Sequence, residues 1–354
     1  MEEERIRFFR MLIDTPSPSG FEEQVQQLFL EQVKDAVDLT YKDVHGNAFG
    51  VINPDCEHKL MLAGHCDEVG LMVSYIDKEG YVYFSTVGGI DPQITQGMPV
   101  VIHTAKGPVS GVIGKKPIHL LEEKERQKVA RIEEQWIDIG AKDGEEARSM
   151  VQIGDPITFD IASRCLAGER ITGKGIDDKV GVFVVCEVLR ELGREKQSLA
   201  FGVYGVSTVQ EELGLRGAKT SAFGINPKIG IAIDVTFASD CPNIDKKKVG
   251  DISLGRGPVL ARGPNINSKL WMRIKRVAEE NNIPYQVQAE ARATGTDANV
   301  IQTTRSGVVT ALLSIPNRYM HTPSEIVDMQ DVENAIRLLV LFIKSLKVEE
   351  NWIP

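Results

Sequence analysis

Acidic and histidine side chains follow several apolar or glycine-rich stretches of this sequence, and together they could hold metal ions. In chain order they are His65-Cys66-Asp67, Asp177-Asp178, Glu211-Glu212, Asp234 and His321. Carboxylates and imidazoles are costly to bury unless they are paired or bind a metal. Groups of this kind at the edge of one sheet are what a two-metal hydrolytic centre requires. The sequence therefore predicts a hydrolase with metal ions at a sheet edge.

The first two motifs each have an ordinary structural explanation as well. His65 and Asp67 follow the apolar run at 60–63, so they either end a strand at the surface or form a metal-binding histidine oriented by a carboxylate. The pair Asp177-Asp178 precedes an apolar segment and suits a helix N-cap. Both explanations of the aspartate pair can hold, because one carboxylate can cap while the other bridges two cations.

The later groups gain weight from the segments before them. Adjacent glutamates are usually solvated, but Glu211-Glu212 follow an apolar run at 203–209 that is typical of a buried strand. At such a strand end one glutamate could bind a metal and the other could act as a general base. Asp234 ends another β-type run and could equally sit in a turn, and His321 could be an ordinary loop histidine.

The segments that carry these groups alternate between strand and helix patterns, which is typical of an α/β protein. The expected helices are at 180–192, 268–281 and about 331–346, and the expected strands are at 199–206, 229–235, 285–289 and 308–314. Such alternation predicts a mixed, largely parallel sheet sandwiched by helices. Ligands of these sheets bind beyond the carboxyl ends of the strands, where the acids fall.

The N-terminal segment is expected to begin with helices. Ser19 and Glu22 have the spacing of a capping box for a helix through 21–29. A strand pair at 48–52 and 60–63 is expected to follow, with Asn53-Pro54-Asp55 as its turn.

Between residues 70 and 161 the pattern changes to short β-type runs separated by Gly, Pro and Asp turns. The runs are at 71–76, 81–86, 100–104, 109–113 and 156–159, and a charged helix-like segment spans 120–134. This pattern predicts a small β-barrel domain at 70–161. It would be inserted into a larger α/β domain formed by residues 1–69 and 162–354.

Composition narrows the class of protein. The net charge of −9 and pI near 5.4 leave no basic surface for nucleic acid. The five cysteines are scattered without a CxxC pair, which favours a reducing cytoplasm over a disulfide framework or structural zinc site. The acidic N-terminus lacks an apolar signal core, and no apolar run is long enough to span a bilayer. We therefore expect a cytoplasmic protein without nucleic-acid or membrane partners.

Taken in order, the motifs resemble those of the M42 family of metallo-aminopeptidases. This family includes tetrahedral aminopeptidases, glutamyl aminopeptidases and homologues labelled as endoglucanases. The matching motifs are His-x-Asp at 65–67, Asp-Asp-Lys at 177–179, Gln-Glu-Glu-Leu-Gly at 210–214, Asp234, and Met-His-Thr-Pro-Ser-Glu at 320–325. Val-Gly-Gly-Ile-Asp at 87–91, Trp-Ile-Asp-Ile-Gly at 136–140 and Gly-Thr-Asp-Ala at 295–298 match too. The resemblance thus covers essentially the whole chain.

The resemblance implies roles for the site residues. The implied metal ligands are His65, Asp177, Glu212, Asp234 and His321. Asp177 would bridge two divalent cations, while His65 and Asp234 would be terminal ligands, one on each cation. Glu212 and His321 would complete the two coordination shells. The cations would be Zn²⁺ or Co²⁺, with Mn²⁺ a further candidate.

The resemblance also implies a reaction and an assembly. Glu211 would be the general base toward a water that bridges the metals, and Asp67 would orient His65, so that the N-terminal residue is hydrolysed from short peptides. The peptide bond between Asp177 and Asp178 would be cis. The fold would be phosphorylase/hydrolase-like, of the zinc-exopeptidase type. Similar proteins form homo-oligomers, from dimers up to tetrahedral dodecamers, and the barrel would serve assembly and gating.

Two positions depart from the family pattern. Cys66 stands where the family usually has Met, but it alternates away from the ligand face, so we expect little effect on the site. Lys179 stands where Arg is usual; it keeps the charge but lacks the bidentate fork, which leaves the salt bridge of that position open.

Two other functions are compatible with the acid pairs. A glycosidase also uses two carboxylates, but it needs no histidine ligands, and the aromatic content of 6% is low for a sugar-binding site. A non-catalytic scaffold on a peptidase fold would be expected to have lost a ligand or the base, and all of these positions are filled here. Sensitivity to a chelator separates a glycosidase from a metallopeptidase.

Overall fold

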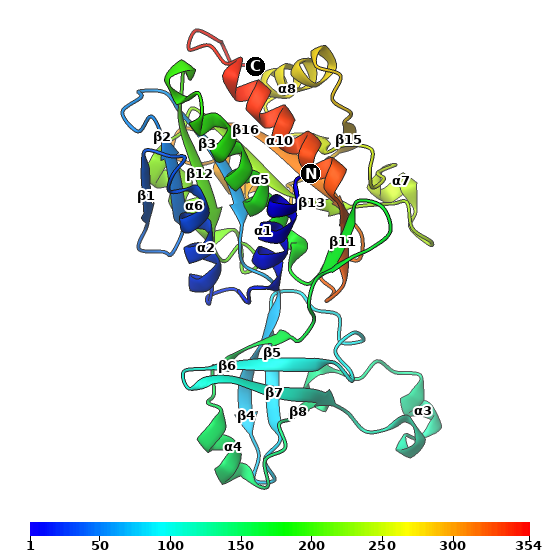
Figure 1. Ribbon diagram of the computed structural model, residues 1–354. Helices are drawn as coiled ribbons and strands as arrows, with labels where there is room; N and C mark the ends of the chain where they lie inside the picture. The colour runs from blue at the N-terminus through cyan, green and yellow to red at the C-terminus, as the bar shows by residue number, and fades with distance from the viewer.

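The structure, a computed structural model, describes residues 1–354, which fold around two hydrophobic cores (Figure 1). The larger core lies in the α/β part at the top of Figure 1, and the smaller one lies in the barrel below it. The chain enters the barrel after β3 (Lys59–His65) and leaves it after β9 (Pro156–Phe159). The barrel is therefore an insertion directly after the strand that carries His65.

An eight-stranded mixed sheet forms the centre of the α/β part, in the order β1-β2-β12-β3-β13-β16-β14-β15. The bounds of its other strands are β1 (Leu39–Lys42), β2 (Ala48–Ile52), β12 (Gly202–Thr208), β13 (Ile229–Phe237), β14 (Val259–Arg262), β15 (Gln286–Ala289) and β16 (Val309–Asn317). The four central strands β12, β3, β13 and β16 are parallel. They are almost continuously apolar because helices cover both faces of the sheet.

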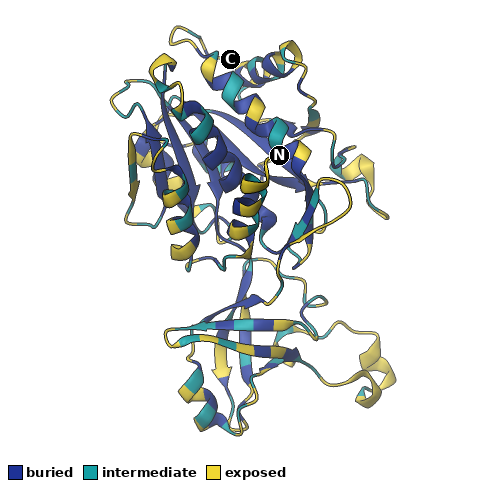
Figure 2. Cartoon of the chain, in the orientation of Figure 1, coloured by how far each residue is buried: buried dark blue, intermediate teal, exposed yellow.

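Helices pack on the two faces of this sheet. The bounds are α1 (Glu3–Asp14), α2 (Glu23–Val33), α5 (Ile176–Gly193), α6 (Arg216–Ile225), α8 (Ser268–Glu280), α9 (Ala298–Ile301) and α10 (Met329–Lys344). On one face α5 lies across β3 and β13, with α1, α2 and α10 beside it, and α6 and α9 cover the other face. Nearly every residue of α5 is buried, as Figure 2 shows by its dark blue colour. No helix combines the length and apolar character that crossing a bilayer needs.

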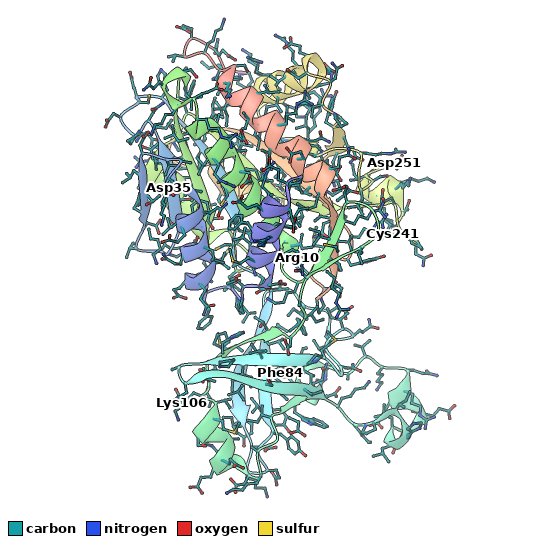
Figure 3. The ribbon with its side chains drawn as sticks, viewed as in Figure 1. Arg10, Asp35, Phe84, Lys106, Cys241 and Asp251 are labelled. Atoms are coloured by element: carbon teal, nitrogen blue, oxygen red, sulfur yellow. The ribbon has the colours of Figure 1, made fainter.

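Six strands close the barrel in the order β4-β5-β8-β7-β6-β9. Those not yet bounded are β4 (Gly70–Ile76), β5 (Val82–Val87), β6 (Pro99–Thr104), β7 (Gly107–Gly114) and β8 (Trp136–Asp138), and α4 (Gly144–Met150) lies beside them. Inward-facing apolar side chains such as Phe84 fill the barrel (Figure 3). A third, small sheet joins the segment that follows the barrel to the segment just before α10. Its strands are β10 (Arg164–Cys165), β11 (Arg170–Gly173) and β17 (Glu325–Asp328). The predicted fold class, a mixed α/β sheet with a small β-barrel, is confirmed.

Two local predictions near the N-terminus were wrong. Ser19 and Glu22 do not form a capping box: α2 has no side-chain cap, and the Ser19 hydroxyl donates to Asp67 Oδ2 at 2.7 Å instead. The strands at 48–52 and 60–63 are not neighbours, because β12 lies between β2 and β3. The hairpin partner of β2 is β1, at 39–42, which the sequence pattern did not indicate. In both cases a contact with a distant segment outcompeted the local pattern.

The charged segment at 120–134 is not one helix. It contains a 3-10 turn (Ile118–Leu120), the short α3 (Glu123–Arg126) and a second 3-10 turn (Ile132–Glu134). None of the residues in these three turns is buried. Short helices without a packed apolar face are marginal in water, so helical composition alone did not produce a helix here. Another 3-10 turn (Lys196–Ser198) and the exposed α7 (Lys246–Val249) complete the elements.

A glycine contact sets how closely α5 approaches the strand that carries His65. A Cβ on Gly64 of β3 would lie 2.5 Å from the carbonyl carbon of Gly181 and 2.7 Å from the nitrogen of Val182. Both are backbone atoms of α5, so they could not yield without moving the helix.

Replacing Gly64 by Ala is expected to lower the free energy of unfolding by about 3 kcal/mol, because the new methyl group overpacks this contact. Urea unfolding followed by circular dichroism measures the change. Gly224→Ala is the control: a Cβ added at Gly224 would meet no atom within 4 Å, so alanine there is expected to stabilise α6 by about 0.5–1 kcal/mol. Equal midpoints for the two variants would contradict the role given to this contact.

Candidate metal centre

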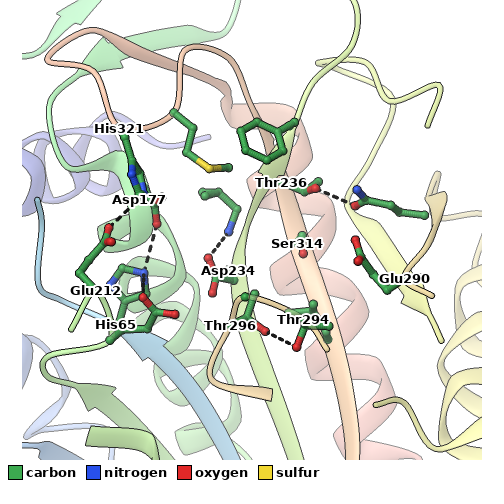
Figure 4. Close-up of a pocket in the computed structure, with 17 residues that line it drawn as sticks. His65, Asp177, Glu212, Asp234, Thr236, Glu290, Thr294, Thr296, Ser314 and His321 are labelled. Carbon is green, nitrogen blue, oxygen red and sulfur yellow. Dashed lines mark hydrogen bonds and ion pairs between the residues drawn. The ribbon is translucent and has the colours of Figure 1, made fainter. Parts of the chain in front are cut away.

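Six of the eight acids and histidines singled out in the sequence meet in one pocket at the carboxyl edge of the central strands (Figure 4). His65 ends β3, Asp234 lies near the end of β13, and Glu211 follows β12. The pocket has a volume of about 360 Å³, and the site residues that line it are His65, Asp177, Glu211, Glu212, Asp234 and His321. Asp67 lies behind this group and is fully buried.

Asp177 lies between the two histidines. Its Oδ1 is 3.1 Å from Nε2 of His65, and its Oδ2 is 3.3 Å from Nε2 of His321. Glu212 Oε1 is also 3.3 Å from Nε2 of His321. The two oxygens of one carboxylate thus face two different imidazoles.

Two sets of donor atoms are close enough for each to surround one cation. Ligand atoms of His65, Asp177 and Glu212 lie within 4.8 Å of one another, and so do those of His65, Asp178 and Asp234. His65 belongs to both sets, and Asp234 lies in the same set as His65. This proximity differs from the expectation that His65 and Asp234 belong to different cations.

Asp67 holds the neighbouring site residues in place. His65 Nδ1 is 3.0 Å from the Asp67 backbone oxygen and 3.4 Å from its Oδ1, which turns Nε2 toward Asp177. The Asp67 carboxylate also accepts hydrogen bonds from the backbone nitrogens of Glu211, at 3.0 Å, and Glu212, at 3.2 Å. One buried carboxylate therefore positions both the histidine and the glutamate pair.

The Asp178 carboxylate serves the backbone. It accepts hydrogen bonds from the nitrogens of His65, at 3.1 Å, and Gly181, at 3.0 Å, so it caps the continuous part of α5. The peptide bond between Asp177 and Asp178 is cis, as the resemblance implied. The helix-cap explanation of the aspartate pair thus holds for Asp178, while Asp177 faces the pocket.

Three residues that support the site were not assigned to it from the sequence. Glu325 accepts hydrogen bonds from the backbone nitrogens of Asp177, at 2.9 Å, and His321, at 2.8 Å. The carbonyl oxygen of Gly89, in the barrel insertion, lies 2.9 Å from His321 Nδ1. Ser19, the third, holds Asp67. Glu325 and Gly89 lie in segments that matched the family motifs, and this match was the sequence feature that could have identified them.

Burial and mutual repulsion dominate the electrostatics of the pocket. Burial raises the pKa values of Asp178 and Asp234 well above their usual range, and it raises that of Glu211 to about 10. Although burial acts in the opposite direction, hydrogen bonds with His321 and His65 hold the pKa of Asp177 below its usual value. Hydrogen bonds to Asp177 and Glu212 raise the pKa of His321 to about 11.

This donor set fits divalent cations. Several buried carboxylates share the pocket with only two imidazoles, and so much buried negative charge is costly unless positive charge is supplied. Imidazole nitrogens and carboxylate oxygens together are ligands that Zn²⁺, Co²⁺ and Mn²⁺ accept.

A buried ion-pair network anchors the floor of the site. Lys179, directly after the aspartate pair, donates to Glu68 Oε1 at 3.1 Å and to the backbone oxygen of Thr15 at 2.7 Å. Lys174 also pairs with Glu68, at 2.9 Å. Burial acts to raise the pKa of Glu68, but the two lysines outweigh it and lower this pKa to about 2. Burial lowers the pKa of Lys179 to about 8. Lys179 therefore makes an ion pair at a position where the family usually has Arg.

Replacing Lys179 by Met is expected to lower the free energy of unfolding by about 3 kcal/mol, because it leaves part of the Glu68 charge uncompensated in the interior. Thermal or urea unfolding measures this loss. The control is Lys34→Met, which removes an exposed lysine paired with Glu31 and is expected to leave the unfolding midpoint nearly unchanged. A Lys179 variant as stable as the Lys34 variant would show that the network does not stabilise the fold.

Cys66, the other departure, is buried with no exposed surface, and burial raises the pKa of its thiol well above the usual value. Its side chain does not line the pocket.

Known proteins with the same fold and similar sequences exist. Residues 46–338 match the family model described as M42 glutamyl aminopeptidase. Over 344 residues the chain is 40% identical to a lysyl aminopeptidase of Pyrococcus furiosus, a match that covers 96% of each protein. The two names differ in the N-terminal residue that they specify.

Two solved structures show how far the similarity extends. The TET aminopeptidase of a Thaumarchaeota archaeon from marine sediment superposes with a TM-score of 0.93 at 35% identity, over 98% of each chain. The TET1 peptidase of Pyrococcus horikoshii, which can assemble into a tetrahedron or a large octahedral shell, superposes with a TM-score of 0.86 at 30% identity. That match covers 97% of this chain and 100% of the other.

Proposed function

The chain belongs to the M42 family and is an aminopeptidase, and on this basis we propose that it removes the N-terminal residue from short peptides with two divalent cations in the described pocket. The observation that carries the proposal is the position of Asp177, whose two oxygens face the two histidines. A carboxylate placed in this way can bridge two cations.

The distances support a particular division of the ligands. His65, Asp177 and Asp234 would hold one cation, because His65 and Asp234 offer atoms within 4.8 Å of each other. Asp177, Glu212 and His321 would hold the other, because His321 Nε2 is equidistant from the two carboxylates at 3.3 Å. This division replaces the expectation that His65 and Asp234 serve separate cations.

Glu211 is the proposed general base. Its carboxylate is buried beside the proposed metal ligands, with Oε2 3.8 Å from His65 Nε2. When bound, the cations would polarise the scissile carbonyl and make an attacking water more acidic. Glu211 would take the proton from this water, hold it, and pass it to the leaving amine. The hydrogen bond from its backbone to Asp67 fixes the start of the Glu211–Glu212 segment during these transfers.

The acids of the pocket also suit the free N-terminus of a peptide. A protonated or partly protonated α-amino group would be attracted to the carboxylates that line the pocket, which would favour exopeptidase over endopeptidase cleavage. The family model is described as glutamyl and the relative as lysyl, so these names leave the preferred N-terminal residue open.

For the two parts of the chain we propose separate tasks. Residues 1–69 and 162–354 would form the catalytic domain, and residues 70–161 would serve assembly and substrate gating. Support comes from the Gly89 contact with His321, which places the insertion at the site, and from the shells formed by the TET1 peptidase. Native mass spectrometry is expected to show a homo-oligomer, from a dimer up to a dodecamer. The cysteines are all free, which supports action in the reducing cytoplasm.

The proposed chemistry is tested with a panel of aminoacyl-p-nitroanilides. Hydrolysis is expected to disappear on dialysis against a chelator and to return with Zn²⁺, Co²⁺ or Mn²⁺, while metal content measured in parallel returns to two ions per subunit. Activity that survives the loss of all bound metal would contradict the proposal.

A further inference from the structure

The proposed metal ligands are here called the donor cluster; they are His65, Asp177, Glu212, Asp234 and His321. The pocket extends beyond this cluster to a second wall, here called the distal wall. It is formed by Thr236, Gln288, Glu290, Thr294, Thr296 and Ser314. In Figure 4 these residues lie across the pocket from His65 and Glu212, and the Glu290 carboxylate points toward Ser314. Glu290 directly follows β15, and it is the charged member of this wall. A substrate bound at the donor cluster would thus have a further compartment beside it.

Four uncharged side chains of the distal wall, Thr236, Gln288, Thr294 and Thr296, are already hydrogen-bonded to one another or to the backbone. Thr236 Oγ1 donates to Gln288 Oε1 at 2.6 Å, and Gln288 Nε2 donates to the backbone oxygen of Val249 at 3.3 Å. Thr296 Oγ1 donates to Thr294 Oγ1 at 3.1 Å. These contacts fix the shape of the wall without involving Glu290.

The side chain of Glu290, in contrast, has no hydrogen-bond or ion-pair partner. It is half-buried, and burial is the one cause that raises its pKa, so no neighbouring cation offsets the cost. A partly buried carboxylate without a partner is unfavourable unless a ligand supplies positive charge. Glu290 is not part of either set of residues that could surround a cation.

We propose that the distal wall receives the side chain of the substrate's N-terminal residue and that Glu290 makes the enzyme select lysine and arginine. The inference rests on the proposed aminopeptidase function and specifies its substrate class. Leu312, Met320 and Phe237 also line the pocket and offer apolar surface for the methylene stem of such a side chain. The ammonium or guanidinium group would then pair with Glu290, while an acidic side chain would be repelled.

The test compares lysyl- and norleucyl-p-nitroanilide, because norleucine has the stem of lysine without its charge. For the wild-type enzyme, kcat/KM is expected to be about 10- to 100-fold higher for lysine, the range that a charge-assisted hydrogen bond supplies. In Glu290→Gln this ratio is expected to fall to near one, with hydrolysis of the norleucine substrate within about twofold of wild type. Glu290→Lys is expected to favour the glutamyl substrate over the lysyl one.

Glu280→Gln is the matched control, since it removes an exposed carboxylate at the end of α8, outside the pocket, and should leave the ratio unchanged. If Glu290→Gln slowed all substrates equally, Glu290 would act on the common α-amino group and the inference would be wrong. A wild-type enzyme that prefers norleucine or glutamate over lysine would also overturn it. Failure to hydrolyse any substrate of the panel would instead contradict the proposed function itself, and the inference with it.

Discussion

Replacing Glu211 by Gln is expected to lower kcat about 10²- to 10⁴-fold while the protein stays folded and keeps its metal ions. Glutamine has nearly the same shape and can still accept hydrogen bonds, but it cannot take a proton from water. The backbone hydrogen bond from Glu211 to Asp67 does not involve the side chain, so the local geometry is expected to persist. Steady-state kinetics with a saturating aminoacyl-p-nitroanilide measures kcat directly.

The variant needs two companion measurements. Metal content and the far-ultraviolet circular dichroism spectrum should match those of the wild type, which separates loss of the base from loss of the site. Glu280→Gln, at the exposed end of α8, is the control for removing a carboxylate and should retain full turnover. A Glu211 variant with near-wild-type kcat and intact metal content would show that another group is the base.

Replacing Asp177 by Asn is expected to remove most of the bound metal and reduce hydrolysis to background. An amide offers one neutral oxygen in place of two anionic ones, so it cannot face both His65 and His321 with negative charge. Metal analysis after dialysis is expected to find less than about one ion per subunit.

The control for Asp177→Asn is Asp331→Asn. Asp331 is also buried, but it accepts hydrogen bonds from the backbone nitrogens of Gly255 and Gly257 and does not line the pocket. This variant is expected to keep its metal even if its stability falls. If the Asp177 variant bound as much metal as the Asp331 variant, Asp177 would not be a bridging ligand.

The fold class could be predicted because strong periodic patterns coincide with the long, buried elements. The apolar helix at 180–192 became α5, and the strand at 229–235 became β13. Strand order could not be predicted, because adjacency depends on which surfaces pack together rather than on order in the chain. The insertion of β12 between β2 and β3 is an example.

For the candidate site, the sequence indicated the residues that meet in the pocket, because parallel strands bring their carboxyl ends to one edge. It did not indicate the residues that support them. Ser19 has the spacing of a helix cap, yet its hydroxyl serves Asp67, 48 positions along the chain. Gly89 contributes only a carbonyl oxygen, which no residue type signals. Glu290 follows a short strand at the sheet edge, where no periodic pattern marks it as part of a pocket.

The most direct test of the account is to follow, by mass spectrometry, the products from one short peptide with a lysine N-terminus and from the same peptide N-acetylated. The metal-loaded enzyme is expected to release residues one at a time from the free N-terminus, to leave the acetylated peptide intact, and to lose this activity once chelation has emptied the site. Cleavage of the acetylated peptide, or cleavage that continues without bound metal, would contradict a metal-dependent aminopeptidase site built on Asp177 and Glu211.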